Sequence, residues 1–278
     1  MSGRTKLAPD AIALCEQALA IRHRDPDAAL ALAQQAAEAA TSAGAAPDAR
    51  RRSLAALGGC LLMFPPEVLR GREHLEQALR ECVEAGDEGL RCVVLNELGE
   101  NYTATSEFAR GMQLLHQALE LSRRLGHQAE EVKALRLLGA ALTGTGDFVQ
   151  ALSLLLEALE IHEATSGEHA AARDAAARWD RGTLFARIAI VYSNMDQFQQ
   201  AISYYEVALE CFAEHYPRRA ARTLYSMGVT AEEMKDVGTA ESCFRRSFTL
   251  HQEHGDASGM ALSQLGIAMT LRTRGELA

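Results

Sequence analysis

The sequence predicts an all-α protein built from repeated pairs of antiparallel helices. Apolar residues make up 48% of the 278 residues, Ala and Leu dominate them, and aromatic residues contribute only 5%. Because Ala and Leu lose little free energy on entering a helix, this composition favours helices over strands. A short signature also recurs along the chain at intervals of about 40 residues, which is typical of a repeat protein.

The signature is a large apolar residue followed by a small one. Its copies are Leu57-Gly58, Leu98-Gly99, Leu138-Gly139, Ile188-Ala189, Met227-Gly228 and Leu265-Gly266. Two further columns follow in register, one of small residues (Gly111, Ala151, Ala201, Ala240) and one of large residues (Leu115, Leu155, Tyr205, Phe244). Two helices approach closely only where one side chain is nearly absent, so we expect each small residue to lie against a large residue of a neighbouring helix.

This pattern resembles the tetratricopeptide repeat (TPR), on the Leu-Gly pair, the tyrosines three residues after it (Tyr102 and Tyr192), and the small and large columns. The resemblance covers residues 50–273 well and residues 9–46 more weakly. It implies a right-handed superhelical solenoid of about six helix pairs plus a terminal unpaired helix.

We expect about thirteen helices, beginning near residues 9, 26, 47, 66, 88, 107, 128, 147, 168, 197, 218, 238 and 257. Residues 1–8 are expected to be disordered and residues 9–278 to form a single solenoid domain. The one stretched interval, around residues 164–182, predicts a longer loop followed by an elongated helix. By register Gly275 belongs to a turn, so we expect the chain to be truncated in the middle of a repeat.

Charge and composition argue against several classes of partner. The net charge is −9 and no basic face is visible, whereas a nucleic-acid-binding domain usually carries one. The N-terminus lacks a signal peptide and no apolar run is long enough to cross a membrane, so we expect a cytoplasmic protein without a membrane partner. The six cysteines are scattered without a C-x-x-C pair, which predicts buried free thiols and no zinc site.

A search for catalytic motifs predicts that this chain is not an enzyme and holds no cofactor or metal. Gly144 and Gly146 fall in a turn between helices, and not after a strand as in a phosphate-binding loop. His251 and His254 lie three apart on a helix and could share a metal, but without a third ligand nearby we interpret them as solvated histidines.

Candidate binding residues follow from the resemblance. In TPR proteins the first helix of each pair lines the concave groove, where ligands usually lie, so exposed residues beside the signature are the candidates. They are Asn96, Glu100, Lys133, Arg136, Arg187, Asn194, Arg222, Tyr225 and Gln264. Four of these are cations on consecutive first helices, which favours an acidic peptide or carboxylate as ligand. The alternative is an ordinary solvated face whose cations pair with nearby glutamates.

Long-period arrays of this kind are similar to the N-terminal sensory arms of bacterial signalling proteins. The resemblance implies a non-catalytic regulatory arm that binds a protein or peptide and precedes an output domain, for which a diguanylate cyclase is the first choice. A stand-alone scaffold or adaptor and a small-molecule-sensing TPR domain of a transcription regulator remain alternatives. The final helix, 257–273, carries an apolar strip, which predicts a homodimer through this helix.

Overall fold

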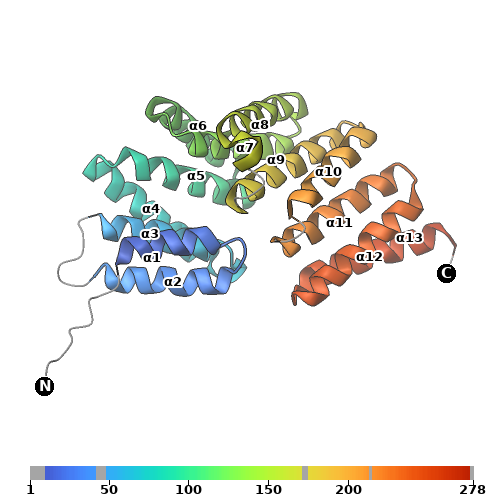
Figure 1. Ribbon diagram of the computed structural model, residues 1–278, viewed down its shortest axis with the longest axis horizontal. Helices are drawn as coiled ribbons and strands as arrows, with labels where there is room; N and C mark the ends of the chain where they lie inside the picture. The colour runs from blue at the N-terminus through green and yellow to red at the C-terminus, as the bar shows by residue number, and fades with distance from the viewer. Residues whose placement is uncertain (1–9, 42–47, 171–174, 213–214, 276–278) are drawn as a thin grey trace, which may run out of the picture. The chain divides into compact units, whose positions relative to one another are not determined.

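A computed structural model describes residues 10–41, 48–170, 175–212 and 215–275. These residues form an all-α fold, as predicted, with thirteen α-helices and one short 3-10 helix (Figure 1). The elements are α1 (Ala11–Ile21), α2 (Pro26–Ala39), α3 (Ala49–Leu61), η1 (Pro65–Glu67), α4 (Val68–Ala85), α5 (Glu88–Ala104), α6 (Phe108–Leu125), α7 (Gln128–Thr145), α8 (Phe148–Ala170), α9 (Ala175–Asn194), α10 (Phe198–Phe212), α11 (Pro217–Glu233), α12 (Val237–Glu253) and α13 (Ala257–Thr273). All the expected helix starts except one lie within about two residues of these bounds.

Backbone contacts divide the chain into two compact units, Met1–Leu137 (unit 1) and Leu138–Ala278 (unit 2). The boundary falls within α7. Odd-numbered helices, here called first helices, pack against the even-numbered second helices that follow them: α1 on α2, α3 on α4 and α5 on α6 in unit 1, and α9 on α10 and α11 on α12 in unit 2. First helices also contact the next first helix, as α3 contacts both α1 and α5. This consecutive pairing is the packing expected of a TPR solenoid.

Each signature glycine lies against a large residue of a neighbouring helix, as predicted. That helix is the following second helix for Gly58, Gly99, Gly139 and Gly228, and the preceding one for Gly266. A Cβ atom added to Gly99 would lie 2.5 Å from Cγ of Leu115, and one added to Gly139 would lie 2.7 Å from Cγ of Leu155. Side chains in a close-packed interior cannot approach so closely, so only glycine fits at these positions. The missing side chain is what lets the two helices of a pair lie close together.

The turns between helix pairs also follow the sequence prediction. Gly86 and Gly126 end α4 and α6 in the left-handed conformation, with φ of 69° and 68°, which glycine adopts without strain. The side chain of Asp87 then accepts a hydrogen bond from the backbone N–H of Leu90 and caps the start of α5. The carboxylate of Asp256 caps α13 in the same way.

The stretched interval differs from its prediction. Helix α8 continues for 23 residues to Ala170 and α9 begins at Ala175, so the expected start near residue 168 and the expected long loop are wrong. This segment is rich in Ala, which favours helix, and the extra residues lengthen two helices. Residues 171–174 lie outside the described ranges. The elongated α9 was expected, and its Trp179 packs with a ring centroid 5.0 Å from that of Tyr216.

Three phenylalanines that lie nine residues after the small residue of the signature are only half-buried. Phe108, Phe148 and Phe198 are each the first residue of a second helix, at the edge of a helix pair. Tyr205 and Phe244 lie in the middle of their helices and are buried as predicted. Column position therefore predicts burial only where the helix is covered on both sides.

The ends of the chain bear on two further expectations. The disorder expected for residues 1–8 falls outside the described residues, as does the segment 276–278. Gly275 has φ of 77° directly after α13, in agreement with the turn expected there. Among the described helices, none is long and apolar enough to cross a membrane.

Candidate functional site

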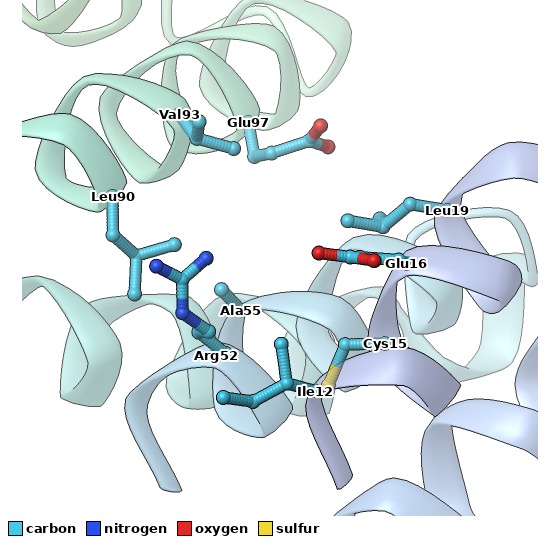
Figure 2. A pocket seen from close by; sticks show the side chains of 9 residues that line it. All are labelled: Ile12, Cys15, Glu16, Leu19, Arg52, Ala55, Leu90, Val93 and Glu97. Carbon is cyan, nitrogen blue, oxygen red and sulfur yellow. The ribbon is translucent and has the colours of Figure 1, made fainter. Parts of the chain in front are cut away.

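A pocket opens on the first-helix side of unit 1, between α1, α3 and α5. Its cavity volume is about 60 Å³, which is small beside the pockets that hold drug-sized ligands. Figure 2 shows the side chains that line it, which are Ile12, Cys15, Glu16, Leu19, Arg52, Ala55, Leu90, Val93 and Glu97. All nine come from first helices, the helices that the sequence predicts for ligand binding.

Helical spacing places each lining residue. On α1, Ile12 and Leu19 are two turns apart and form one wall with Cys15 and Glu16 between them. On α5, Leu90 and Val93 form the opposite wall. These side chains enclose a largely apolar space, to which the intervening helix α3 contributes Ala55 and Arg52.

Ala55 of α3 forms the floor of the pocket, and the residues beside it are also apolar and buried. Ala55, Cys15 and Leu90 are nearly inaccessible to solvent, whereas Leu19 at the rim is 36% exposed. Burial raises the pKa of the Cys15 thiol to about 11, so it stays protonated and is a poor nucleophile at neutral pH. The pocket therefore offers an apolar surface and no activated thiol.

One end of the pocket is closed by a buried ion cluster centred on Glu97. Its Oε1 lies 2.8 Å from Nη1 of Arg22, which follows α1, and 2.5 Å from Nζ of Lys133 on α7. Gly59 of α3 makes room for this bridge, since a Cβ atom there would lie 3.0 Å from Nη1 of Arg22. Burial alone would raise the pKa of Glu97, but the two cations outweigh it and hold that pKa below its usual range.

His23 lies beside this cluster as a neutral side chain. Burial lowers its pKa most, and the positive charge of Arg22 adds to the effect, which brings the pKa to about 2. The Nε atom of Arg22 lies 3.3 Å from Nε2 of His23, so the imidazole nitrogen accepts a hydrogen bond from the guanidinium. The cluster thus holds a neutral histidine among charged groups.

The rim of the pocket carries two further charges. The Nε atom of Arg52 donates to Asp48 at 2.7 Å, so this cation already has a carboxylate partner. Glu16 is exposed and forms no ion pair with any described residue. Figure 2 shows both side chains pointing into the pocket from different helices.

The candidate residues in unit 1 differ in exposure from what the sequence predicts. Asn96 is fully buried, and its Nδ2 donates to the backbone oxygen and the carboxylate of Glu130. Arg136 is 6% exposed and Lys133 is largely covered, while Glu100 is half-buried. Asn96 and Arg136 are therefore not the exposed groove residues expected, and Asn96 is covered by the next first helix, α7.

The candidate residues in unit 2 are more accessible. Arg222, Asn194 and Gln264 are exposed, and Arg187 is half-buried. The Nδ2 atom of Asn194 donates to the backbone oxygen of its own helix at Ile190. Asn194 therefore helps to end α9.

Tyr225, the remaining candidate in unit 2, is half-buried. Its ring centroid lies 5.5 Å from that of Phe244, so it packs against the following second helix. The four candidate cations are divided between the units, Lys133 and Arg136 in unit 1 and Arg187 and Arg222 in unit 2. Their sharing of one channel stays a prediction.

The residues on which the sequence search for chemistry depended have local structural roles. His251 is buried, and its Nδ1 lies 2.9 Å from Oδ2 of Asp256 at the start of α13, so it is not the solvated residue expected. In the part of the chain that the structure describes, no group of three or more His, Cys, Asp or Glu side chains is arranged to hold a metal ion. All six cysteines are free and buried, as predicted.

The fold is that of a helical-repeat protein, and family comparisons indicate the kind of repeat. Residues 90–164 match one tetratricopeptide repeat profile and residues 183–215 match another. These two ranges are thus similar to TPRs, in agreement with the sequence pattern. A comparison with curated protein sequences finds no significant match.

Solved structures share the fold along most of the chain. The Rap protein complexed with competence and sporulation factor is 14% identical, with a TM-score of 0.68 over 95% of this chain and 87% of that one. NprR, the quorum sensor from B. thuringiensis, in complex with its cognate peptide NprX, is 16% identical, with a TM-score of 0.66 over 97% and 74%. BtubC (BKLC) from P. vanneervenii is 17% identical, with a TM-score of 0.57 over 92% and 94%. Identities this low indicate a common fold and do not transfer a function.

Proposed function

We propose that this chain is a non-catalytic regulatory domain that recognises a peptide segment on the first-helix side of unit 1. The pocket between α1, α3 and α5 carries the proposal. Its walls are apolar, its rim is charged, and it lies on helices that TPR proteins use for ligands. A peptide supplies both an apolar side chain and polar backbone groups, which is the combination that this pocket can accommodate.

The structural neighbours support a peptide as the ligand. NprR was solved with its cognate peptide and the Rap protein with competence and sporulation factor, and both share this fold over more than nine-tenths of the present chain. We infer by analogy a sensory role in a cytoplasmic bacterial signalling protein. None of these comparisons supports the diguanylate cyclase output domain expected from the sequence, so the proposal does not include it.

Selection from a random heptapeptide library displayed on phage tests the proposal. We expect the chain to enrich a family of related peptides, and synthetic copies to bind in fluorescence anisotropy. Leu19→Ser, at the rim, should weaken binding about fivefold, because it removes part of the apolar surface that the peptide covers. Leu69→Ser is the matched control, since Leu69 is 69% exposed on the second helix α4.

The proposal fails if no peptide is enriched, or if Leu69→Ser weakens binding as much as Leu19→Ser does. A stand-alone adaptor that binds only folded proteins would give the first result.

A further inference from the structure

We propose that the α1–α3–α5 pocket selects a peptide in which a large aliphatic residue has a Lys or Arg one or two positions away. This inference rests on the proposed peptide-binding function and adds the chemistry of the ligand. The argument depends on which charges around the pocket already have partners and which do not.

Each cation that lines the pocket or closes its end already contacts a carboxylate. Arg22 and Lys133 share the carboxylate of Glu97, and Arg52 is paired with Asp48. An acidic ligand group would have to compete with these short contacts, two of which are buried. A cation inside such a cluster is therefore a weak recognition element for a carboxylate from solution.

Glu16 is the charge at the rim without an ion-pair partner among the described residues. It lies on α1 one turn after Ile12 and almost one turn before Leu19, so its carboxylate stands directly over the apolar space. Ile12 and Leu19 on the same wall are apolar, so Glu16 is the charged group of that wall. An exposed, unpaired carboxylate beside an apolar pocket is complementary to a cation that is attached close to an apolar group.

The apolar part of the pocket sets the other requirement. Its walls and floor are aliphatic or thiol side chains, namely those of Ile12, Leu19, Leu90, Val93, Ala55 and Cys15. Such a surface favours Leu, Ile or Met over a polar side chain. Successive residues of an extended peptide are about 3.3 Å apart, so a Lys or Arg one or two positions away reaches Glu16 from an anchored aliphatic residue.

Arg52 supplies a contact that does not depend on the ligand's side chains. Only its Nε is engaged by Asp48 in the hydrogen bonds of the described residues, and a guanidinium has further N–H donors on its two Nη atoms. These atoms can donate to a peptide carbonyl. The pocket would then contact three groups of the peptide: an apolar side chain, a backbone oxygen and a cation.

The experiment compares peptide selections on the wild type, Glu16→Lys and Glu84→Lys. Glu84 is exposed on the second helix α4, away from the pocket lining, so its reversal changes net charge equally and serves as the control. We expect the wild type and Glu84→Lys to enrich peptides with an aliphatic residue within two positions of Lys or Arg. Replacing that cation by Gln should weaken binding about fivefold, and Glu16→Lys should lose the preference for it.

Two results would overturn the inference while leaving the proposed function in place. One is enrichment of peptides without a nearby cation, for example acidic ones. The other is a set of peptides that Glu16→Lys and the wild type bind equally well. Failure of the wild type to enrich any peptide would overturn the proposed function and this inference together. Circular dichroism of each variant separates loss of binding from loss of the fold.

Discussion

Lys133 on α7 and Glu97 on α5 form a buried ion pair, with Nζ 2.5 Å from Oε1, and Arg22 reaches the same oxygen at 2.8 Å. A residue that the sequence assigns to ligand binding is thus engaged within unit 1. Since one carboxylate is the partner of both cations, its removal leaves two positive charges with little access to water. The cluster joins the end of α1 to α5 and α7, across α3.

We predict that Glu97→Gln lowers the free energy of unfolding by about 3–5 kcal/mol, the cost usually found when one partner of a buried ion pair is removed. Urea unfolding at pH 7 measures it. The matched control is Glu88→Gln, because Glu88 pairs with Arg124 at 2.6 Å but both side chains are over 40% exposed. That variant should change the free energy by less than about 1 kcal/mol. Equal effects would show that burial gives the cluster no special weight.

His23 predicts how stability depends on pH. Its pKa is about 2 in the folded chain against an ordinary value of 6.5, so the unfolded chain binds a proton that the folded chain refuses. Stability from this residue is therefore complete above pH 6.5 and declines as the pH falls from 6.5 toward 2. The slope approaches about 1.4 kcal/mol per pH unit for one proton.

Measurements at pH 7, 6 and 5 suit this test because carboxylates of ordinary pKa stay mostly ionised over that range. His251, whose pKa is lowered by burial despite Asp256, contributes in the same direction. His23→Gln should reduce the slope, and His116→Gln, which removes an exposed histidine from α6, controls for the substitution. If the wild type and His23→Gln have the same slope, His23 is not held neutral.

Two glycines on α5 should respond in opposite directions to the same substitution. Gly99→Ala places a methyl group 2.5 Å from Cγ of Leu115, so we expect a loss of about 1–3 kcal/mol from overpacking. At Gly89 the nearest atom to an added Cβ, on His127, is 3.5 Å away, an ordinary contact. Gly89→Ala should therefore raise stability by up to about 1 kcal/mol, because Ala is the better helix former. The midpoints of thermal unfolding of the two variants test this prediction. A higher midpoint for Gly99→Ala would show that the repeat register is wrong.

The turns within helix pairs allow a complementary test of backbone strain. Lys235, in the turn between α11 and α12, has φ of 66°. Gly146, in the turn between α7 and α8, has φ of 87°. A left-handed conformation costs a side-chain-bearing residue about 1–2 kcal/mol, so Lys235→Gly should stabilise the chain by about 0.5–1 kcal/mol. Gly146→Ala should destabilise it by about 1 kcal/mol through the backbone alone, since no atom lies within 4 Å of the added Cβ. A lower urea midpoint for Lys235→Gly would contradict this account.

Periodicity in the sequence predicted most of the helix bounds and the close contacts of Gly99 and Gly139, because both depend on residues within one repeat. Periodicity did not predict the exposure of the candidate residues. Asn96 and Arg136 are buried, Asn96 against Glu130 of the next first helix, and the partner of Glu97 at Arg22 lies two repeats away. No periodic column contains such contacts, since they depend on how successive pairs stack.

The pocket was missed for a related reason. Its α1 wall belongs to the N-terminal segment, where the repeat signature is weak and no register assigned Ile12 or Leu19 to a face. A local signal was nevertheless present. Glu16 interrupts an apolar stripe at helical spacing between Ile12 and Leu19, and a charge within such a stripe is a candidate for a ligand-facing position.

The final prediction concerns α13, whose Leu262, Leu265 and Met269 share one face and are 51%, 57% and 36% exposed. Exposed apolar strips of this kind tend to find a partner, and the sequence predicts a second copy of the chain. We expect sedimentation to show a monomer–dimer equilibrium at roughly 100 µM, as weak interfaces give. Leu262→Glu with Leu265→Glu should abolish the dimer, because burying two carboxylates is costly. Val149→Glu is the control, since Val149 is 73% exposed but lies on α8. A wild type that stays monomeric at that concentration, or a dimer that survives the double substitution, would place α13 outside any interface between copies.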